Sequence, residues 1–296
     1  MNPLLEVNEL QKKYPSFLLD RISFHLPQGS ITGFIGANGA GKTTTLHSIL
    51  NIIDYDAGHI VFRGERLTKE RNDLKKYIGY MGNYNKFYDN VKLKVIAQFV
   101  SEVYSDHWDP IYYRYLTNNL FELDTNKRVK ELSRGMQAKF ALTLALSHHP
   151  ELLILDEPTS GLDPISRDAL LDVLFELRQE KNTTILFSSH LTEDMEKIAD
   201  TILFIDQGKL LLQASQEDLR NRFKRLEEKY IEAEQPIMQK AVHSKGYVIF
   251  DVTEYPQMCT LPMENARADE ILRYLKTNSS EAVPLFEAGR SDVIRN

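Results

Sequence analysis

A glycine-rich segment near the N-terminus has the residue types and spacing of a loop that binds phosphate. The run GANGAGKT from Gly36 to Thr43 satisfies G-x-x-x-x-G-K-[S/T]. Glycines let successive backbone N–H groups curl around phosphate oxygens. In such a loop Lys42 reaches the β- and γ-phosphates of a nucleotide, and the Thr43 hydroxyl ligates Mg²⁺. The residues expected to bind ATP here are Gly36, Asn38, Gly39, Ala40, Gly41, Lys42, Thr43 and Thr44.

Two carboxylates follow a separate apolar run. Leu152–Leu155 is typical of a buried strand and leads directly into Asp156 and Glu157. Beside a phosphate loop, Asp156 would hold Mg²⁺, directly or through water. Glu157 would orient and deprotonate the attacking water as general base. An acidic turn after a buried strand is also common without any catalytic role, but the upstream phosphate loop favours hydrolysis.

The elements that must position these residues alternate between strand and helix, which predicts a mostly parallel sheet covered by helices. A mainly helical stretch, from Val91 to about Ser147, interrupts the alternation. The predicted strands are at Leu18–Leu26, Ile31–Ile35, His59–Phe62, Leu152–Leu155 and Thr184–Phe187. The predicted helices are at Gly41–Ile52, Ile165–Arg178 and Thr192–Ala199, and a hairpin is predicted over Thr201–Leu212.

The character of the sequence changes after about residue 215. A densely charged stretch at Arg220–Lys229 is interpreted as a helix, Tyr247–Val252 as a strand and Ala268–Leu275 as a helix. The sequence therefore predicts a main domain over residues 1–215 and a small α+β extension over residues 216–296. The extension shows no catalytic constellation, and a regulatory or dimer-stabilising role is a hypothesis from its position.

Composition narrows the class of protein. The 296 residues are 42% hydrophobic and 26% charged, which is typical of a globular protein. The net charge of −6 gives no reason to expect nucleic-acid binding. The single cysteine, Cys259, fits a reducing cytosol. No signal peptide and no apolar run of about 20 residues are evident.

Four further features make the chain resemble the ABC ATPases over about residues 3–215. The run LSRGM from Leu132 resembles the signature motif of that family, and SGLD from Ser160 resembles its D-loop. His190 matches the switch histidine, and Tyr14 matches the aromatic residue that stacks on adenine. The resemblance implies an α/β P-loop NTPase (RecA-like) core, an antiparallel β subdomain and an inserted helical subdomain at about residues 84–147.

The resemblance also implies roles for these residues. Ser133 and Gly135 would face the γ-phosphate held by a second cassette, in a head-to-tail dimer that encloses two ATP molecules. Asp163 would contact that second cassette, and His190 would act in catalysis with Glu157 and Lys42. Each residue also has a plainer interpretation. The four alternatives are an N-cap for Ser133, a turn residue for Asp163, a structural histidine for His190 and a packed ring for Tyr14.

The sequence departs from the family pattern at three positions. Arg134 replaces the first glycine of the signature motif, and Met136 replaces its glutamine. Ser133 and Gly135 remain, so we expect activity to survive. Asn83 stands where the Q-loop usually has a glutamine, and its shorter amide predicts looser contact with Mg²⁺ or the lytic water.

The function implied is that of an ATP-hydrolysing subunit that drives a separately encoded membrane permease, in the manner of bacterial exporters. It would lie in the cytoplasm, on the inner face of the membrane through the permease, beside an identical or paralogous cassette. Phe87, Tyr88, Tyr104 and Trp108 would form the groove that receives the permease, or else a local aromatic core. The alternatives are a soluble ABC ATPase without a transport role and a poorly hydrolysing regulatory subunit.

Overall fold

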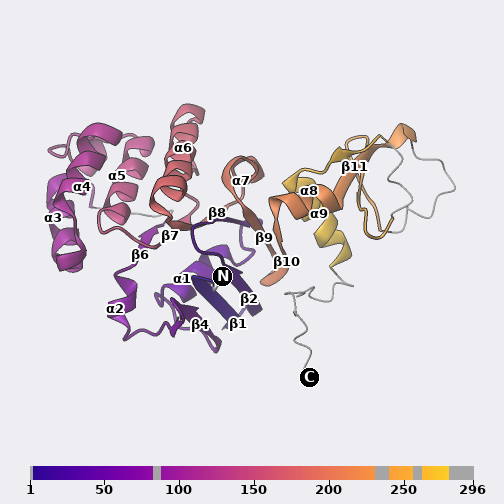
Figure 1. Ribbon diagram of the computed structural model, residues 1–296, viewed down its shortest axis with the longest axis horizontal. Helices are drawn as coiled ribbons and strands as arrows, with labels where there is room; N and C mark the ends of the chain where they lie inside the picture. The colour runs from indigo at the N-terminus through magenta and orange to yellow at the C-terminus, as the bar shows by residue number, and fades with distance from the viewer. Residues whose placement is uncertain (1–2, 83–87, 231–239, 256–261, 280–296) are drawn as a thin grey trace, which may run out of the picture. The chain divides into compact units, whose positions relative to one another are not determined.

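The computed structural model describes residues 3–82, 88–230, 240–255 and 262–279. The chain divides into two compact units, Met1–Leu210 and Leu211–Asn296. Figure 1 shows the order of the elements along the chain. Asn83, Phe87 and Cys259 lie outside the described residues.

A six-stranded sheet forms the centre of the first unit, with strand order β10-β9-β3-β8-β7-β6, and its edge strand β10 continues past Leu210. Its strands are β3 (Ile31–Ile35), β6 (Ile78–Met81), β7 (Leu152–Asp156), β8 (Thr184–Ser189), β9 (Thr201–Asp206) and β10 (Lys209–Ser215). The pairs β6–β7, β7–β8, β8–β3 and β3–β9 are parallel. All residues of β3, β7 and β8 are buried, as near-continuous apolar runs in a covered parallel sheet require. The carboxyl ends of these strands meet at one edge, where ligands bind in open α/β sheets.

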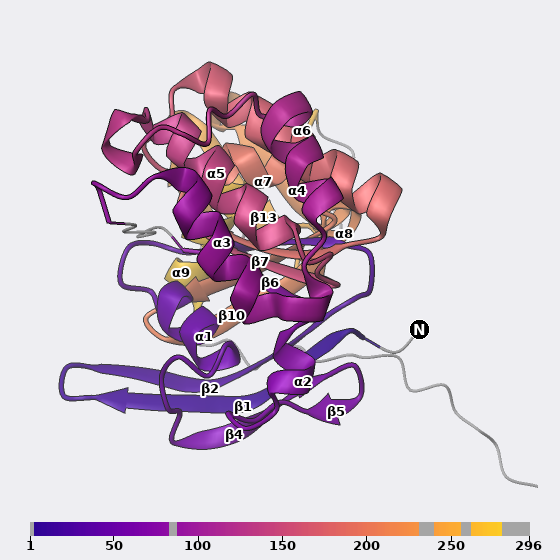
Figure 2. The same cartoon turned by 90° about the vertical axis from the view of Figure 1, so that its left-hand side faces the viewer.

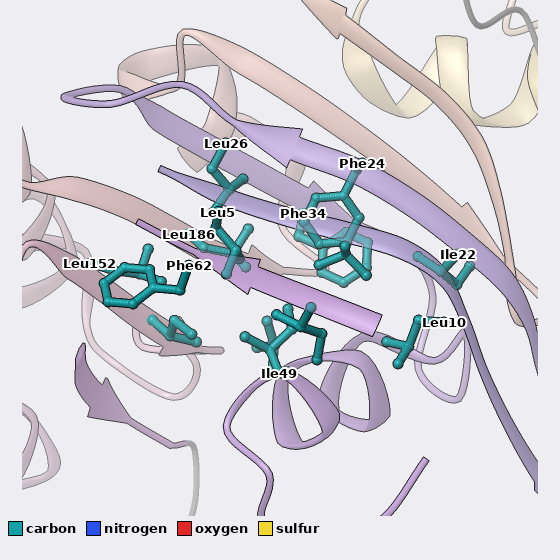
Figure 3. Close-up of a cluster of buried hydrophobic side chains, with 14 of the residues drawn as sticks. Leu5, Leu10, Ile22, Phe24, Leu26, Phe34, Ile49, Phe62, Leu152 and Leu186 are labelled. Atoms are coloured by element: carbon teal, nitrogen blue, oxygen red, sulfur yellow. The ribbon is translucent and has the colours of Figure 1, made fainter. Parts of the chain in front are cut away.

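A second sheet, antiparallel, has the order β2-β1-β4-β5. Its strands are β1 (Leu5–Tyr14), β2 (Phe17–Leu26), β4 (Ala57–Phe62) and β5 (Glu65–Arg66). Its apolar face packs with helix α1 (Lys42–Ile49) and with side chains of the parallel sheet in one core. Figure 3 shows part of this core, including Leu5, Leu10, Phe24, Phe34, Ile49, Phe62, Leu152 and Leu186. This shared core fixes the start of α1 against β3, and with it the loop that joins them.

The predicted helical insertion is present. Its elements are α3 (Leu93–Tyr104), η1 (Ser105–His107), α4 (Pro110–Tyr115), the π-helical turn η2 (Leu116–Leu120), η3 (Val129–Glu131) and α5 (Arg134–Leu146). Asp109 caps α4 by accepting hydrogen bonds from two backbone N–H groups. Helices α3, α4 and α5 gather on the side of β6 and β7 away from the antiparallel sheet (Figure 2). The short helix α2 (Asn72–Lys75) precedes β6, and α6 (Pro164–Lys181) and α7 (Thr192–Ile198) flank β8 in sequence.

The second unit is a small α+β fold with the sheet order β12-β13-β11-β14. Its elements are α8 (Gln216–Arg222), β11 (Phe223–Glu227), η4 (Glu228–Tyr230), β12 (Val242–Ser244), β13 (Tyr247–Asp251), β14 (Glu264–Asn265) and α9 (Ala268–Asn278). The predicted helix over Arg220–Lys229 is wrong, because the helix ends at Arg222 and a central strand follows. Phe223 and Leu226 are buried in that strand, and the charged Lys224 and Arg225 are satisfied by polar groups of β14. Pairing with strands on both sides thus outweighs the helical character of the charged run.

A buried histidine makes stability depend on pH. His148 is only 2% exposed and its ring stacks on Tyr104 at a centroid distance of 3.8 Å. Burial lowers the pKa of His148 from 6.5 to about 4. Between these values the unfolded chain binds a proton that the folded chain does not, so acid destabilises the fold. We expect the free energy of unfolding to fall by up to about 3 kcal/mol between pH 6.5 and 4 from this residue.

Chemical denaturation across that pH range measures the effect. His148→Asn should flatten the pH dependence of the free energy of unfolding, whereas His59→Asn, at an exposed position, should leave the slope unchanged. A slope that is identical in wild type and His148→Asn would contradict the assignment.

Candidate nucleotide site

The glycine-rich loop joins β3 to α1, as predicted, and its backbone depends on two glycines. Gly41 has φ +114°, a conformation that other residues rarely adopt, and α1 begins directly after it. A Cβ on Gly36 would lie 2.6 Å from the carbonyl oxygen of Ile205 in β9. The loop therefore lies tightly against the sheet and leads into the N-terminus of a helix, where backbone N–H groups and the helix dipole favour phosphate.

Lys42 is buried beneath this loop. Its Nζ donates to the carbonyl oxygens of Gly36 at 2.8 Å and Ala37 at 3.3 Å. Nζ also lies 3.2 Å from Oε1 of Glu157, a contact between opposite charges whose angle is not that of a hydrogen bond. The Lys42 ammonium can therefore exchange these two carbonyl oxygens for phosphate oxygens bound in the same loop.

Glu157 lies between the lysine and the histidine that the sequence singled out. His190 Nδ1 is 2.6 Å from Glu157 Oε2, so the three predicted catalytic residues form one connected group. Glu157 has φ +52°, which is uncommon for a residue other than glycine. Such backbone strain is concentrated at functional sites. Glu157 also lines a cleft of about 330 Å³ with Met81, Gly82 and Arg134.

Asp156 is buried and lies at the centre of a hydrogen-bond network. Its Oδ2 accepts from the Thr43 hydroxyl at 2.8 Å, and its Oδ1 accepts from the Ser188 hydroxyl at 2.6 Å. The backbone N–H of Glu157 donates to the same Ser188 hydroxyl at 3.1 Å. Ser188 thus fixes both acidic residues, and the sequence interpretation missed it. A usable signal was present, because β8 is an apolar strand that ends in two serines, and Ser188 pairs in register with Asp156.

The side chains of Thr43 and Asp156 suit Mg²⁺. They present a hydroxyl and a carboxylate oxygen within 2.8 Å of each other, and hard oxygen ligands are the ones that Mg²⁺ takes. The described residues hold no cluster of three or more His, Cys, Asp or Glu side chains that could hold a metal alone. This fits a cation that is bound by one carboxylate, one hydroxyl and the phosphates of a nucleotide.

The signature and D-loop residues have clear roles within the chain. Ser133 caps α5 by accepting from the Met136 N–H at 3.2 Å. A Cβ on Gly135 would lie 2.9 Å from Ser166 Oγ in α6, so the two helices approach closely at this position. Asp163 caps α6 and accepts from the backbone N–H of Ser166 at 3.0 Å, a bond that lowers the pKa of its carboxyl group. These contacts bear out the plainer interpretation of Ser133 and replace the turn role of Asp163 with an N-cap, and they leave the dimer roles as predictions.

Comparison with known proteins decides the family. The family model described as ABC transporter matches residues 19–160. The bacitracin transport ATP-binding protein BcrA of Bacillus licheniformis is 33% identical over 243 residues, which are 82% of this chain and 78% of that protein. This chain is an ATP-binding subunit of the ABC transporter family. The ATP-binding protein YtrB of Bacillus subtilis (strain 168) is 29% identical to the subunit over 286 residues, or 95% of the chain and 94% of YtrB.

A solved structure supports the same fold for this ABC subunit. The structure of an ATP-binding subunit of an ABC transporter has a TM-score of 0.66 and 27% identity, and covers 74% of this chain and 92% of its own. The predicted fold class, a P-loop NTPase with an antiparallel subdomain and an inserted helical subdomain, is therefore confirmed. The subunit is an ABC ATPase whose hydrolysis of ATP is coupled to transport.

Two predicted site residues of the ABC subunit remain to be placed. Tyr14 ends β1 with a partly exposed ring, whose centroid is 6.4 Å from that of Phe17. The Phe17 ring in turn lies 3.1 Å from the position of a Cβ on Gly41, so Tyr14 is a neighbour of the phosphate loop. Stacking on adenine stays a prediction for Tyr14. Asn83, the predicted Q-loop ligand, lies outside the described residues.

Proposed function

We propose that the subunit hydrolyses ATP at the group formed by Lys42, Glu157 and His190, and that it drives a separately encoded permease of the exporter type. One observation supports this assignment of the site. The carboxylate of Glu157 lies 3.2 Å from Nζ of Lys42 and 2.6 Å from Nδ1 of His190. The support for export is the signature variant with Arg134 and the similarity to a protein named for bacitracin transport.

Each residue then has a chemical role. Lys42 leaves the loop carbonyl groups and pairs with the β- and γ-phosphates of ATP. Glu157, released from Lys42, accepts a proton from the water that attacks the γ-phosphate. His190 keeps its contact with Glu157 and orients that carboxylate. Thr43 and Asp156 hold Mg²⁺, which neutralises charge on the phosphates when it is bound.

A second cassette, identical or paralogous, completes the site. Ser133 and Gly135 open helix α5, and Ser133 and Asp163 are exposed to solvent. Backbone N–H groups at the start of a helix favour an anion. This supports the assignment of Ser133 and Gly135 to the γ-phosphate that the opposing subunit binds. In a head-to-tail dimer each ATP is then bound by the phosphate loop of one subunit and by the signature helix of the other.

An exposed apolar stripe on α3 is our candidate for the permease contact. Val95, Phe99 and Val103 recur with a spacing of four residues and are 50%, 67% and 65% exposed. Side chains at this spacing share one helical face. Helices of soluble domains normally turn such a face toward the core, and an outward apolar face marks an interaction site. A groove or helix on the cytoplasmic side of a permease fits this stripe.

The aromatic residues predicted to receive the permease divide into two groups. Tyr104 stacks on His148, and Trp108 packs against Tyr113 at a centroid distance of 5.3 Å. These two rings form the local aromatic core that was the alternative interpretation. Tyr88 is 84% exposed and remains part of the proposed contact surface. Phe87 lies outside the described residues.

The permease contact predicts the effect of a charge on the stripe. Phe99→Glu should reduce the amount of membrane protein that copurifies from native membranes by about tenfold, since a buried unpaired charge costs more than about 1.4 kcal/mol. ATP turnover by the isolated subunit should not change. Gln98→Glu adds the same charge at the neighbouring exposed position and is the matched control. Full copurification with Phe99→Glu, or an equal loss with both variants, would contradict the proposed surface.

The place of the subunit in the cell follows from the same proposal. No helix of the described residues is long and apolar enough to cross a bilayer. We place the subunit on the cytoplasmic face of the membrane, where the permease holds it. A regulatory or dimer-stabilising role for the C-terminal unit stays a prediction.

A further inference from the structure

A buried carboxylate that the proposed reaction does not use lies close to the site. Asp194, in the first turn of α7, has a fully buried side chain. Its Oδ2 accepts from the Thr159 hydroxyl at 2.7 Å. Its Oδ1 accepts from Nε of Arg167 in α6. Both oxygens are therefore occupied by groups from other segments of the chain.

Stability alone does not explain this arrangement. Removing a carboxylate and a guanidinium from water costs energy that their attraction only partly returns, and apolar replacements of such pairs are often as stable. What a buried pair does supply is a defined geometry, because every polar atom must be satisfied. The geometry defined here is that of the segments that the carboxylate holds together.

The three segments are those that adjoin Glu157, Asp163 and His190. Thr159 is two residues after Glu157, in the turn that continues to Asp163. Arg167 lies in the first turn of α6, directly after Asp163. Asp194 itself is four residues after His190, in the helix that follows that residue. One carboxylate thus ties the turn after the general base, the D-loop helix and the helix behind the switch histidine.

We infer that Asp194 is a positioning residue that joins the D-loop to His190. A displacement of the turn between Glu157 and Asp163 is carried through the Thr159 hydroxyl and Arg167 to α7, and so to His190. Contact of the D-loop with a second cassette then sets the His190–Glu157 geometry for hydrolysis. The inference rests on the proposed dimer, and it gives a physical route by which one ATP site affects the other.

The contacts of Asp194 with Thr159 and Arg167, here called the Asp194 bridge, lead to a specific kinetic prediction. Asp194 bonds through its carboxylate to Thr159 and Arg167, neither of which belongs to the phosphate loop, so loss of these contacts should leave ATP binding intact. Thr159→Val, which removes the hydroxyl and keeps the shape, should lower kcat by about 5- to 30-fold, which corresponds to about 1–2 kcal/mol. The KM for ATP should stay within about twofold, and the Hill coefficient for ATP should fall toward 1.

The chain provides controls for this experiment, all in the full-length subunit. Thr159→Ser retains the hydroxyl and should restore kcat. Asp168→Asn breaks an exposed ion pair of 2.7 Å with Lys197, which joins the same two helices α6 and α7, and should leave kcat unchanged. Arg167→Lys keeps the charge but loses the planar donor and should reproduce the loss of Thr159→Val. It also tests the bridge if Thr159→Val does not fold.

Several outcomes would overturn the inference. They are a kcat for both Thr159→Val and Arg167→Lys within twofold of wild type, an equal loss in Thr159→Ser and Thr159→Val, and a rise in KM without a change in kcat. An absence of ATP hydrolysis in the wild-type subunit would instead contradict the proposed function. The two failures are therefore distinguishable in one set of assays.

Discussion

Glu157→Gln is expected to lower ATP turnover by about 10²- to 10⁴-fold, the usual contribution of a general base. The variant should still bind MgATP, because glutamine keeps the size of the side chain and Lys42 remains free to pair with phosphate. Binding without hydrolysis should hold two subunits closed on ATP. Phosphate release measures the first effect, and size-exclusion chromatography with and without MgATP measures the second.

The control for this variant is another glutamate close in sequence. Glu151 is half-buried and pairs with Arg63 at 3.5 Å; it lies directly before β7, at the opposite end of that strand from Asp156. Glu151→Gln should turn over ATP at the wild-type rate and should not form a trapped dimer. Normal turnover in Glu157→Gln would remove Glu157 as the base. A loss of nucleotide binding in Glu157→Gln would show that its effect is structural.

Lys42→Met should affect nucleotide binding rather than hydrolysis, and should weaken MgATP binding by about 10- to 100-fold. Hydrogen bonds to charged groups contribute about 1.5–3 kcal/mol each, and the lysine is the buried cation beneath the loop. Titration with a fluorescent ATP analogue measures the dissociation constant directly. Lys75→Met removes a half-buried lysine whose Nζ donates to the Lys69 carbonyl oxygen, and it should leave the constant unchanged.

The two variants together separate binding from chemistry. Glu157→Gln should bind ATP and fail to hydrolyse it, whereas Lys42→Met should fail at the first step. If Lys42→Met binds MgATP with unchanged affinity, then Lys42 of the wild-type protein keeps its contacts with Gly36 and Ala37 when nucleotide binds. The role that we give to its exchange of partners would then be wrong.

The sequence predicted the parts of the site that depend on short segments. The phosphate loop, the strand before Asp156 and the alternation of strands and helices each follow from local pattern, and the structure has all three. Ser188 and Asp194 were not found, because their roles depend on which strands and helices are neighbours. The pairing of Asp156 with Ser188 across two parallel strands brings together residues 32 positions apart.

The C-terminal unit shows the same limit for secondary structure. The charged run after Arg220 has helical character, and only its pairing with β13 and β14 makes a strand of Phe223–Glu227. Helix α9, by contrast, was predicted correctly at Ala268–Leu275. Its apolar positions recur at helical spacing, and this local signal needs no knowledge of the neighbours.

The exposed stripe of Val95, Phe99 and Val103 has a consequence for synthesis in the cell. In a subunit made in excess of its permease, this apolar surface would stay exposed to solvent, and two such subunits could associate through it. The net charge of −6 opposes this association only through repulsion that salt screens. Balanced production of the two proteins, rather than the fold of either one, would then keep the orphan subunit from aggregating.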